Sequence, residues 1–246
     1  SSDVCSSDLA TGHHARVRCI DGVWRLLRGA DPAKDQSYVI HMLDQRMMER
    51  TLLPVGEMTK TEVRALADRL GLRTADKPDS QDVCFITSNK GTDGRSGRES
   101  FLGRRIPLHP ADVVDEDGRR LGAVEAVELV TIGQRRGVAG GGGDKRFVVD
   151  VDVPGRRVVV GAETSLLTDH EIGRGATWTD RPRSGPVAVQ CSAHGELRLA
   201  TISGADEVRI DWNRPERRVS PGQSLVFYDI ENGWVVGGAV TGRREL

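Results

Sequence analysis

A cysteine that follows a polar, turn-forming run is the residue of this chain best suited to covalent chemistry. Residues 76–81 read Asp-Lys-Pro-Asp-Ser-Gln, and Cys84 stands just before a Phe-Ile pair. Cys84 is therefore expected where a loop enters buried structure, and such a position can hold a nucleophilic thiol on a rigid base. Cys84 could equally be a small buried apolar residue. The negative charges of Asp79 and Asp82 also disfavour the thiolate form of its side chain. The residue types alone do not decide whether Cys84 is reactive or inert.

Two further polar segments could bind a ligand. In the first, Gly12 would let the backbone approach a bound group closely, and His13 could donate to a phosphate or a base. A turn followed by an exposed histidine explains that segment equally well. In the second, Lys34 and Gln36 flank Asp35, a natural N-cap, so both would project from a helix start that favours anions.

Composition and charge narrow the classes of function. The chain has 246 residues, a net charge of −1, 37% apolar residues and 29 glycines. This balance favours turns, hairpins and small β-rich units over one large α/β core. Because no overall positive field attracts a polyanion, any nucleic-acid binding must use local basic clusters such as Arg135 and Arg136.

The cysteine pattern and the hydropathy indicate the compartment. The four cysteines lie far apart, without a CxxC pair or a histidine pair at ligand spacing: Cys5, Cys19, Cys84 and Cys191. We therefore expect neither a metal site nor a disulfide framework. No apolar run reaches the roughly 20 residues of a membrane span, and no secretory signal is present. These features predict a cytoplasmic protein with reduced thiols.

Helical spacing predicts two helices in the first third of the chain. The first is expected between Asp35 and Pro54, with a stripe of Val39, Leu43 and Met47 in the core. The second begins after Thr59, which forms a capping box with Glu62, and it ends at Gly71. The loop that contains Cys84 would follow this second helix.

The remaining signals are those of strands and turns. Asp-Gly or Pro-Gly pairs predict hairpins at residues 21–22, 117–118 and 154–155. From about residue 166 onward, short alternating runs are separated by turns at regular intervals. This part is expected to form a small antiparallel barrel or sandwich.

An ordered set of motifs identifies a family. ATGHHAR, LLRGADPAKDQSYV, LPVGEMTKTEVRALADRLGL, DKPDSQDVCFI, TIGQRRGV and SPGQSLVFY follow one another in this chain. In this order they resemble the bacterial tRNA-specific 2-thiouridylase (MnmA) family, and the resemblance extends from Ala10 to Leu246. The family replaces the C2 oxygen of the wobble uridine of certain tRNAs with sulfur. ATP, used with Mg²⁺, adenylates that oxygen, and a cysteine persulfide delivers the sulfur.

The resemblance implies roles for individual residues. Cys84 matches the persulfide-carrying cysteine, Gly12 a residue of the ATP pocket and His13 a residue that touches tRNA. Further tRNA contacts are implied at residues 34–36 (Lys34, Asp35 and Gln36) and, in the C-terminal barrel, at Ser192, Ala193 and Gln223. A sulfur-relay protein or a cysteine desulfurase is the implied protein partner. A disulfide bond is a further expectation taken from the family.

The resemblance also implies three structural parts. Residues 10–88 would be the trailing part of an α/β domain of the adenine-nucleotide-hydrolase-like, PP-loop type. Residues 89–165 would form a small central α+β domain, and residues 166–246 an antiparallel β-barrel. Residues 1–9 read as a non-native leader.

Several features depart from the family pattern. The SGGxDSS pyrophosphate loop is not in the sequence, and neither is a second catalytic cysteine before the ATGH motif. Ser192, followed by Ala193, stands where the family often has an arginine, and Val124 and Leu129 stand where a histidine and an aromatic residue are usual. We therefore expect an N-terminally truncated member that is inactive alone. A non-catalytic RNA-binding module and another ATP-pyrophosphatase-type ligase are the alternatives.

Overall fold

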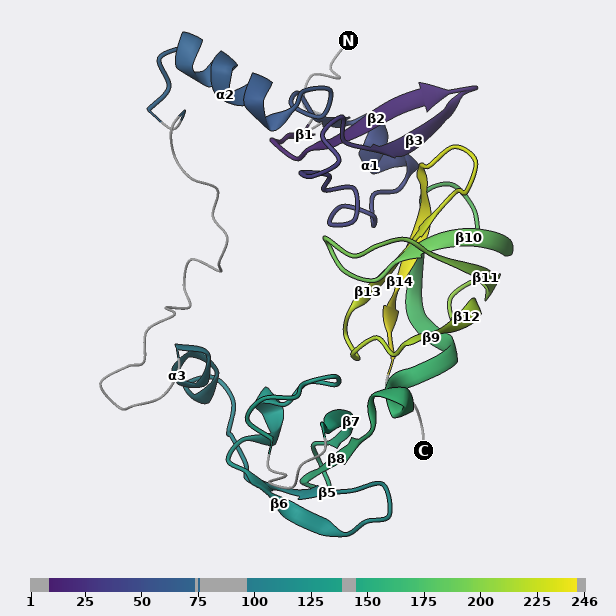
Figure 1. Cartoon of the computed structure of the whole chain (residues 1–246). Coiled ribbons are helices and arrows are strands. Elements are labelled where there is room, and N and C mark those ends of the chain that lie inside the picture. Colours follow the sequence, from purple (N-terminus) through teal and green to yellow (C-terminus); the bar gives the residue numbers. More distant parts are fainter. Residues whose placement is uncertain (1–8, 74, 76–96, 139–144, 243–246) are drawn as a thin grey trace. The chain divides into compact units, whose positions relative to one another are not determined.

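The computed structural model describes residues 9–73, 75, 97–138 and 145–242 (Figure 1). The chain forms two compact units. The first combines Ser1–Lys77 with Thr168–Leu246, and the second is Pro78–Leu167. The predicted loop around Cys84 lies outside the described residues.

A closed barrel forms the C-terminal part of the first unit. Its six strands follow the order β13-β10-β11-β12-β9-β14, and an antiparallel pairing of β13 with β14 closes the ring. Val187, Ile202 and Phe227 are among the fully buried side chains of its core. The alternating pattern therefore correctly predicted a barrel. The strands are β9 Leu167–Trp178, β10 Gly185–Gln190, β11 Arg198–Gly204, β12 Val208–Arg217, β13 Ser224–Tyr228 and β14 Val235–Thr241.

An N-terminal hairpin extends the barrel sheet. Strands β2 (Ala15–Ile20) and β3 (Val23–Arg28) are joined by the predicted Asp-Gly turn, in which both residues have positive φ. Leu26 of β3 lies opposite Val235 of β14. Leu26 is fully buried in a second core that N-terminal and barrel residues share: Ala15, Leu26, Met48, Ala188, Val226, Tyr228 and Val235. The first unit is therefore stabilised by packing between distant parts of the sequence.

The helix expected between Asp35 and Pro54 is mostly absent, so this prediction was wrong. Within that range only α1 (Gln45–Glu49) is helical, with Asp44 as its N-cap, and the rest is turns, irregular backbone and a two-residue strand. Met47 is 52% exposed, whereas its neighbour Met48 is buried. The carboxylate of Asp35 binds other groups, described below, so it does not cap a helix. A two-residue parallel pairing of β1 (Leu9–Ala10) with β4 (Thr51–Leu52) follows α1.

Helix α2 (Lys60–Arg69) confirms the second helical prediction. Thr59 and Glu62 form the capping box, and Gly71 has a φ of +66° just beyond the C-terminus. Hydrogen bonds from the backbone N–H and the hydroxyl of Thr59 lower the pKa of Glu62. No residue of α2 is fully buried among the described residues, so its apolar stripe is only partly covered.

The second unit contains α3 (Gly97–Gly103) and a four-stranded sheet of order β6-β5-β8-β7. Its two predicted hairpins, at residues 117–118 and 154–155, are confirmed. Fully buried valines, such as Val113 and Val158, form its core. The strands are β5 Ala111–Val114, β6 Arg120–Val124, β7 Phe147–Asp152 and β8 Arg157–Gly161, and single 3-10 turns lie at η1 Val127–Leu129 and η2 Glu163–Leu166. In neither unit do the described helices have the length and apolar character needed to cross a membrane.

Candidate functional site

The two N-terminal segments that could bind a ligand lie side by side. The backbone N–H of His14 donates to the side-chain oxygen of Gln36 at 2.9 Å. In return, the backbone N–H of Gln36 donates to the carbonyl oxygen of His14, also at 2.9 Å. These reciprocal hydrogen bonds fix the loop after β1 against the turn at residues 31–37. The side-chain amide of Gln36 therefore helps to hold these two backbone segments together.

Gly12 and His13 lie at the accessible edge of this junction. Gly12 is exposed, and a Cβ atom added to it would meet no atom within 4 Å. Its backbone is therefore open to a bound group. His13 is partly exposed, and its Nδ1 lies 2.9 Å from the hydroxyl oxygen of Thr11. That contact orients the imidazole and leaves Nε2 as the second ring nitrogen for a ligand.

Asp35 is buried beneath the same turn. Its Oδ1 accepts from the backbone N–H groups of Gly29 (2.9 Å) and Ser37 (3.1 Å). Its Oδ2 accepts from Arg28 Nη1 (2.8 Å) and from the Ser37 hydroxyl (2.9 Å). With four donors on its two oxygens and 8% of its surface exposed, Asp35 orders the turn from within. Lys34, one residue earlier, is exposed.

Arg28 extends this network to the barrel. Its Nη2 donates to Gln190 Oε1 at 2.8 Å, and its guanidinium lies over the ring of Tyr228, 4.1 Å from the centroid. The amide nitrogen of Gln190 then donates to the carbonyl oxygens of Ser192 (2.9 Å) and Ala193 (3.1 Å). The 34–36 turn and the 192–193 loop, both expected to contact tRNA, are therefore connected through two buried or half-buried side chains.

Tyr228 supports the network from the barrel side. Its hydroxyl lies 3.0 Å from the Ser37 hydroxyl, whose own proton is donated to Asp35. Tyr228 is therefore the donor of the pair. Burial raises the pKa of Tyr228 to about 12, although the hydrogen bond to Ser37 opposes this effect, so the phenol stays protonated at neutral pH.

Gln223 immediately precedes β13. Its backbone carbonyl accepts from the N–H and the hydroxyl of Thr241, and its side chain is exposed. Tyr38, just after the 31–37 turn, donates its hydroxyl to the carbonyl oxygen of Ser224 at 3.0 Å. Tyr38 therefore connects the end of the N-terminal turn with the first residue of β13.

Sequence reasoning missed Arg28 and Gln190. Gln190 is 3% exposed and ends a strand whose preceding residues are apolar. A lone amide at the end of a buried run is a usable signal, because a buried polar side chain needs hydrogen-bond partners. Arg28 has no such signal, since its partner in the barrel, Gln190, is distant in the chain.

Comparison with known proteins decides the family. Three family models match successive parts of the chain: a tRNA methyl transferase HUP domain at residues 2–88, a tRNA methyl transferase PRC-barrel domain at 99–162 and an aminomethyltransferase β-barrel domain at 168–241. Two relatives named tRNA-specific 2-thiouridylase MnmA are similar over most of the chain. That of Acidothermus cellulolyticus is 40% identical over 89% of this chain, and that of Chloroflexus aurantiacus 38% identical over 97%.

The chain belongs to the tRNA-specific 2-thiouridylase (MnmA) family. It spans 61% of the length of the Acidothermus thiouridylase and 66% of the Chloroflexus one. The family models confirm the expected fold classes: a HUP-type α/β part, a small middle domain, here of PRC-barrel type, and a C-terminal antiparallel barrel.

The cysteines do not support the disulfide bond expected from the thiouridylase family. Cys19 and Cys191, the cysteines that the structure describes, are both free. Cys84, the expected sulfur carrier, lies outside the described residues. Burial raises the pKa of the Cys191 thiol to about 11, with Glu171 and Glu216 adding to the effect and Arg198 opposing it. Cys191 is therefore a protonated, unreactive thiol at neutral pH.

The two described cysteines of this thiouridylase homologue are expected to differ in reactivity. Because the thiolate is the nucleophile and the pKa of Cys191 is raised, iodoacetamide at pH 8 should label Cys191 about 100-fold more slowly than exposed Cys19. The rate at Cys191 should rise about tenfold per pH unit until pH approaches the raised pKa. Peptide mass mapping measures both sites. Equal rates in the folded protein would contradict the prediction, and equal rates in 6 M guanidinium are the control.

Proposed function

We propose that this chain acts in the synthesis of 2-thiouridine in tRNA, replacing the C2 oxygen of the wobble uridine with sulfur. The observation that carries the proposal is the network from His14 through Gln36, Asp35, Arg28 and Gln190 to the 192–193 loop. It joins in one unit the segments expected to contact tRNA, in a chain of the thiouridylase family.

The chemistry requires a carrier thiol and an activated base. ATP is the substrate that converts the C2 oxygen into a leaving group, and the exposed backbone at Gly12 offers room for it. The terminal sulfur of a persulfide on Cys84 forms a bond to C2, and AMP departs with the oxygen. A thiolate supplied from outside this chain, such as that of a small-molecule thiol, then donates an electron pair to the sulfur of Cys84. The S–S bond breaks, the outer sulfur stays on C2 and a disulfide forms.

Binding of tRNA requires the wobble base to leave the anticodon stack. An extruded base is read in a pocket, while side chains around it hold the backbone by shape and charge. His13 and Lys34 are accessible and bear suitable donors, whereas the carboxylate of Asp35 is enclosed. We assign direct tRNA contact to His13 and Lys34 and a positioning role to Asp35. A cysteine desulfurase or a sulfur-relay protein would load Cys84.

Persulfide mapping tests the proposal. The 246-residue chain is incubated with a cysteine desulfurase and cysteine, alkylated and digested, and each cysteine peptide is weighed. A mass gain of one sulfur atom is expected on the Cys84 peptide and not on the Cys191 peptide. Cys84→Ser should lose the modification, and Cys19→Ser, the matched control, should keep it. Equal sulfur loading of Cys19 and Cys84 would refute the assignment of Cys84.

A further inference from the structure

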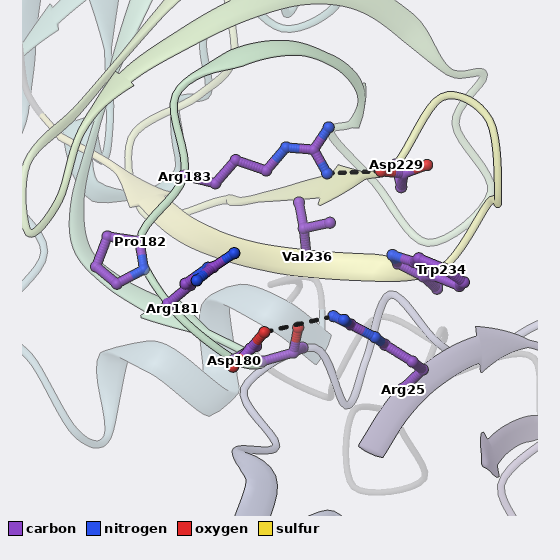
Figure 2. Close-up of a pocket in the computed structure, with 9 residues that line it drawn as sticks. Arg25, Asp180, Arg181, Pro182, Arg183, Asp229, Trp234 and Val236 are labelled. Atoms are coloured by element: carbon purple, nitrogen blue, oxygen red, sulfur yellow. Dashed lines mark hydrogen bonds and ion pairs between the residues drawn. The ribbon is translucent and has the colours of Figure 1, made fainter. Parts of the chain in front are cut away.

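A pocket of about 350 Å³ lies in the first unit, where the N-terminal hairpin meets the barrel (Figure 2). It is lined by Arg25 of β3, by residues 179–183 that follow β9, and by Asp229, Trp234 and Val236 around the β13–β14 turn. None of the residues of the candidate site described above lines this pocket. Its size falls within the range of small-ligand sites.

Two ion pairs are part of the pocket wall, Arg183 with Asp229 and Arg25 with Asp180. Arg183 Nη1 and Asp229 Oδ2 are 2.6 Å apart, and the backbone N–H groups of Glu231 and Asn232 donate to Asp229 Oδ1. Burial favours the neutral acid, but the hydrogen bonds from Arg183 and Asn232 outweigh it and hold the pKa of Asp229 below its ordinary value. The charge of Arg183 is therefore neutralised within the protein.

Two other arginines keep donors for a ligand. Arg25 Nη1 and Asp180 Oδ2 form the longer ion pair, 3.8 Å apart and beyond hydrogen-bond distance, and Arg25 Nε is buried without a hydrogen-bond partner among the described residues. Arg181 is exposed and forms no ion pair within the described part of the chain. Figure 2 shows both guanidinium groups, with Arg183 and Trp234, arranged around Val236.

An aromatic surface completes the pocket. Trp234 is half-buried, and its ring lies 5.0 Å from the guanidinium carbon of Arg25. Planar guanidinium groups bind phosphate oxygens with two parallel hydrogen bonds, and an indole ring stacks with nucleobases of any sequence. An anion beside a flat ring is the chemistry of a nucleotide.

We propose that this pocket binds one nucleotide of RNA, with its phosphodiester at Arg25 and Arg181 and its base against Trp234. The inference rests on the proposed function, because it gives tRNA a second contact outside the candidate site. The contact is independent of base identity, so it adds affinity and orientation and reads no sequence.

Arg181→Gln is the variant that tests the proposal in tRNA binding. Arg181 is exposed, so its loss leaves the fold intact. Affinity for labelled tRNA, measured by anisotropy over a range of salt concentrations, should fall about three- to tenfold, and the salt slope should decrease by about one. Arg209→Gln is the matched control, since Arg209 is an exposed barrel arginine paired with Asp211. Equal binding by the two variants would overturn the inference.

An NMR experiment tests the pocket independently of the proposed function. The indole N–H signal of Trp234, assigned with Trp234→Phe, should shift when a 5′-phosphorylated RNA trinucleotide is added to the full chain, and Arg181→Gln should weaken that shift. No shift would overturn the pocket. An equal shift with AMP would show that the pocket binds a free nucleotide instead of RNA. An equal shift with an acidic peptide would show that it binds a protein instead. Failure of the wild-type chain to bind any tRNA, with the trinucleotide shift retained, would instead count against the proposed function.

Discussion

Replacing Asp35 with alanine is expected to lower the free energy of unfolding by about 3 kcal/mol. The change removes the acceptor of two backbone N–H groups, those of Gly29 and Ser37, and the partner of the Arg28 guanidinium. Donors left unpaired in a buried turn cost their full desolvation energy, which explains the size of the effect. Urea denaturation followed by circular dichroism measures it.

Two companion variants show whether Asp35 acts by contact or by position. Asp35→Asn keeps an acceptor oxygen and should lose less stability than Asp35→Ala. Lys34→Ala removes an exposed neighbour, so its stability should stay within about 0.5 kcal/mol of wild type while tRNA affinity falls. A variant Asp35→Ala that is as stable as Lys34→Ala yet binds tRNA more weakly would show that the carboxylate contacts tRNA directly.

Leu26→Ala is expected to destabilise the whole first unit by about 2–5 kcal/mol. Leu26 has no exposed surface and packs in the core that contains Val226, Tyr228 and Val235 of the barrel. Because the cavity would open between the hairpin and the barrel, both should unfold in one transition at a lower denaturant concentration. Near-ultraviolet circular dichroism and hydrogen exchange of barrel amides measure that transition.

Leu199→Ala is the matched control, because Leu199 lies on barrel strand β11 and is 51% exposed. Its effect should stay within about 0.5 kcal/mol. If Leu26→Ala melts the hairpin in a separate early transition and leaves barrel exchange unchanged, the shared core does not couple the two.

The elements predicted correctly are those specified by neighbouring residues. The Asp21-Gly22 turn needs two residues with positive φ, and those two residue types adopt it most readily. Helix α2 follows from a capping box contained within four residues, Thr59 to Glu62. The barrel strands follow from the alternation of apolar and polar residues, because any strand register must keep the apolar residues on the buried face.

The misplaced elements depend on partners that helical spacing does not reveal. Asp35 has the residue type of an N-cap, but Arg28 and the backbone of Gly29 bind its carboxylate, and no helix starts there. Periodicity also placed Met47 in the core, whereas the short helix α1 buries Met48. In the site, Arg28 meets Gln190 across 162 positions, a separation that no local pattern encodes.

The pairing of β3 with β14 constrains how this protein is made. Leu26 of the hairpin is translated 209 positions (235 − 26) before Val235, its neighbour in the sheet. At ordinary elongation rates the interval is roughly 10 to 40 s. During that time the apolar face around Leu26 has no barrel to cover it, so the nascent chain should engage a chaperone before β14 is complete.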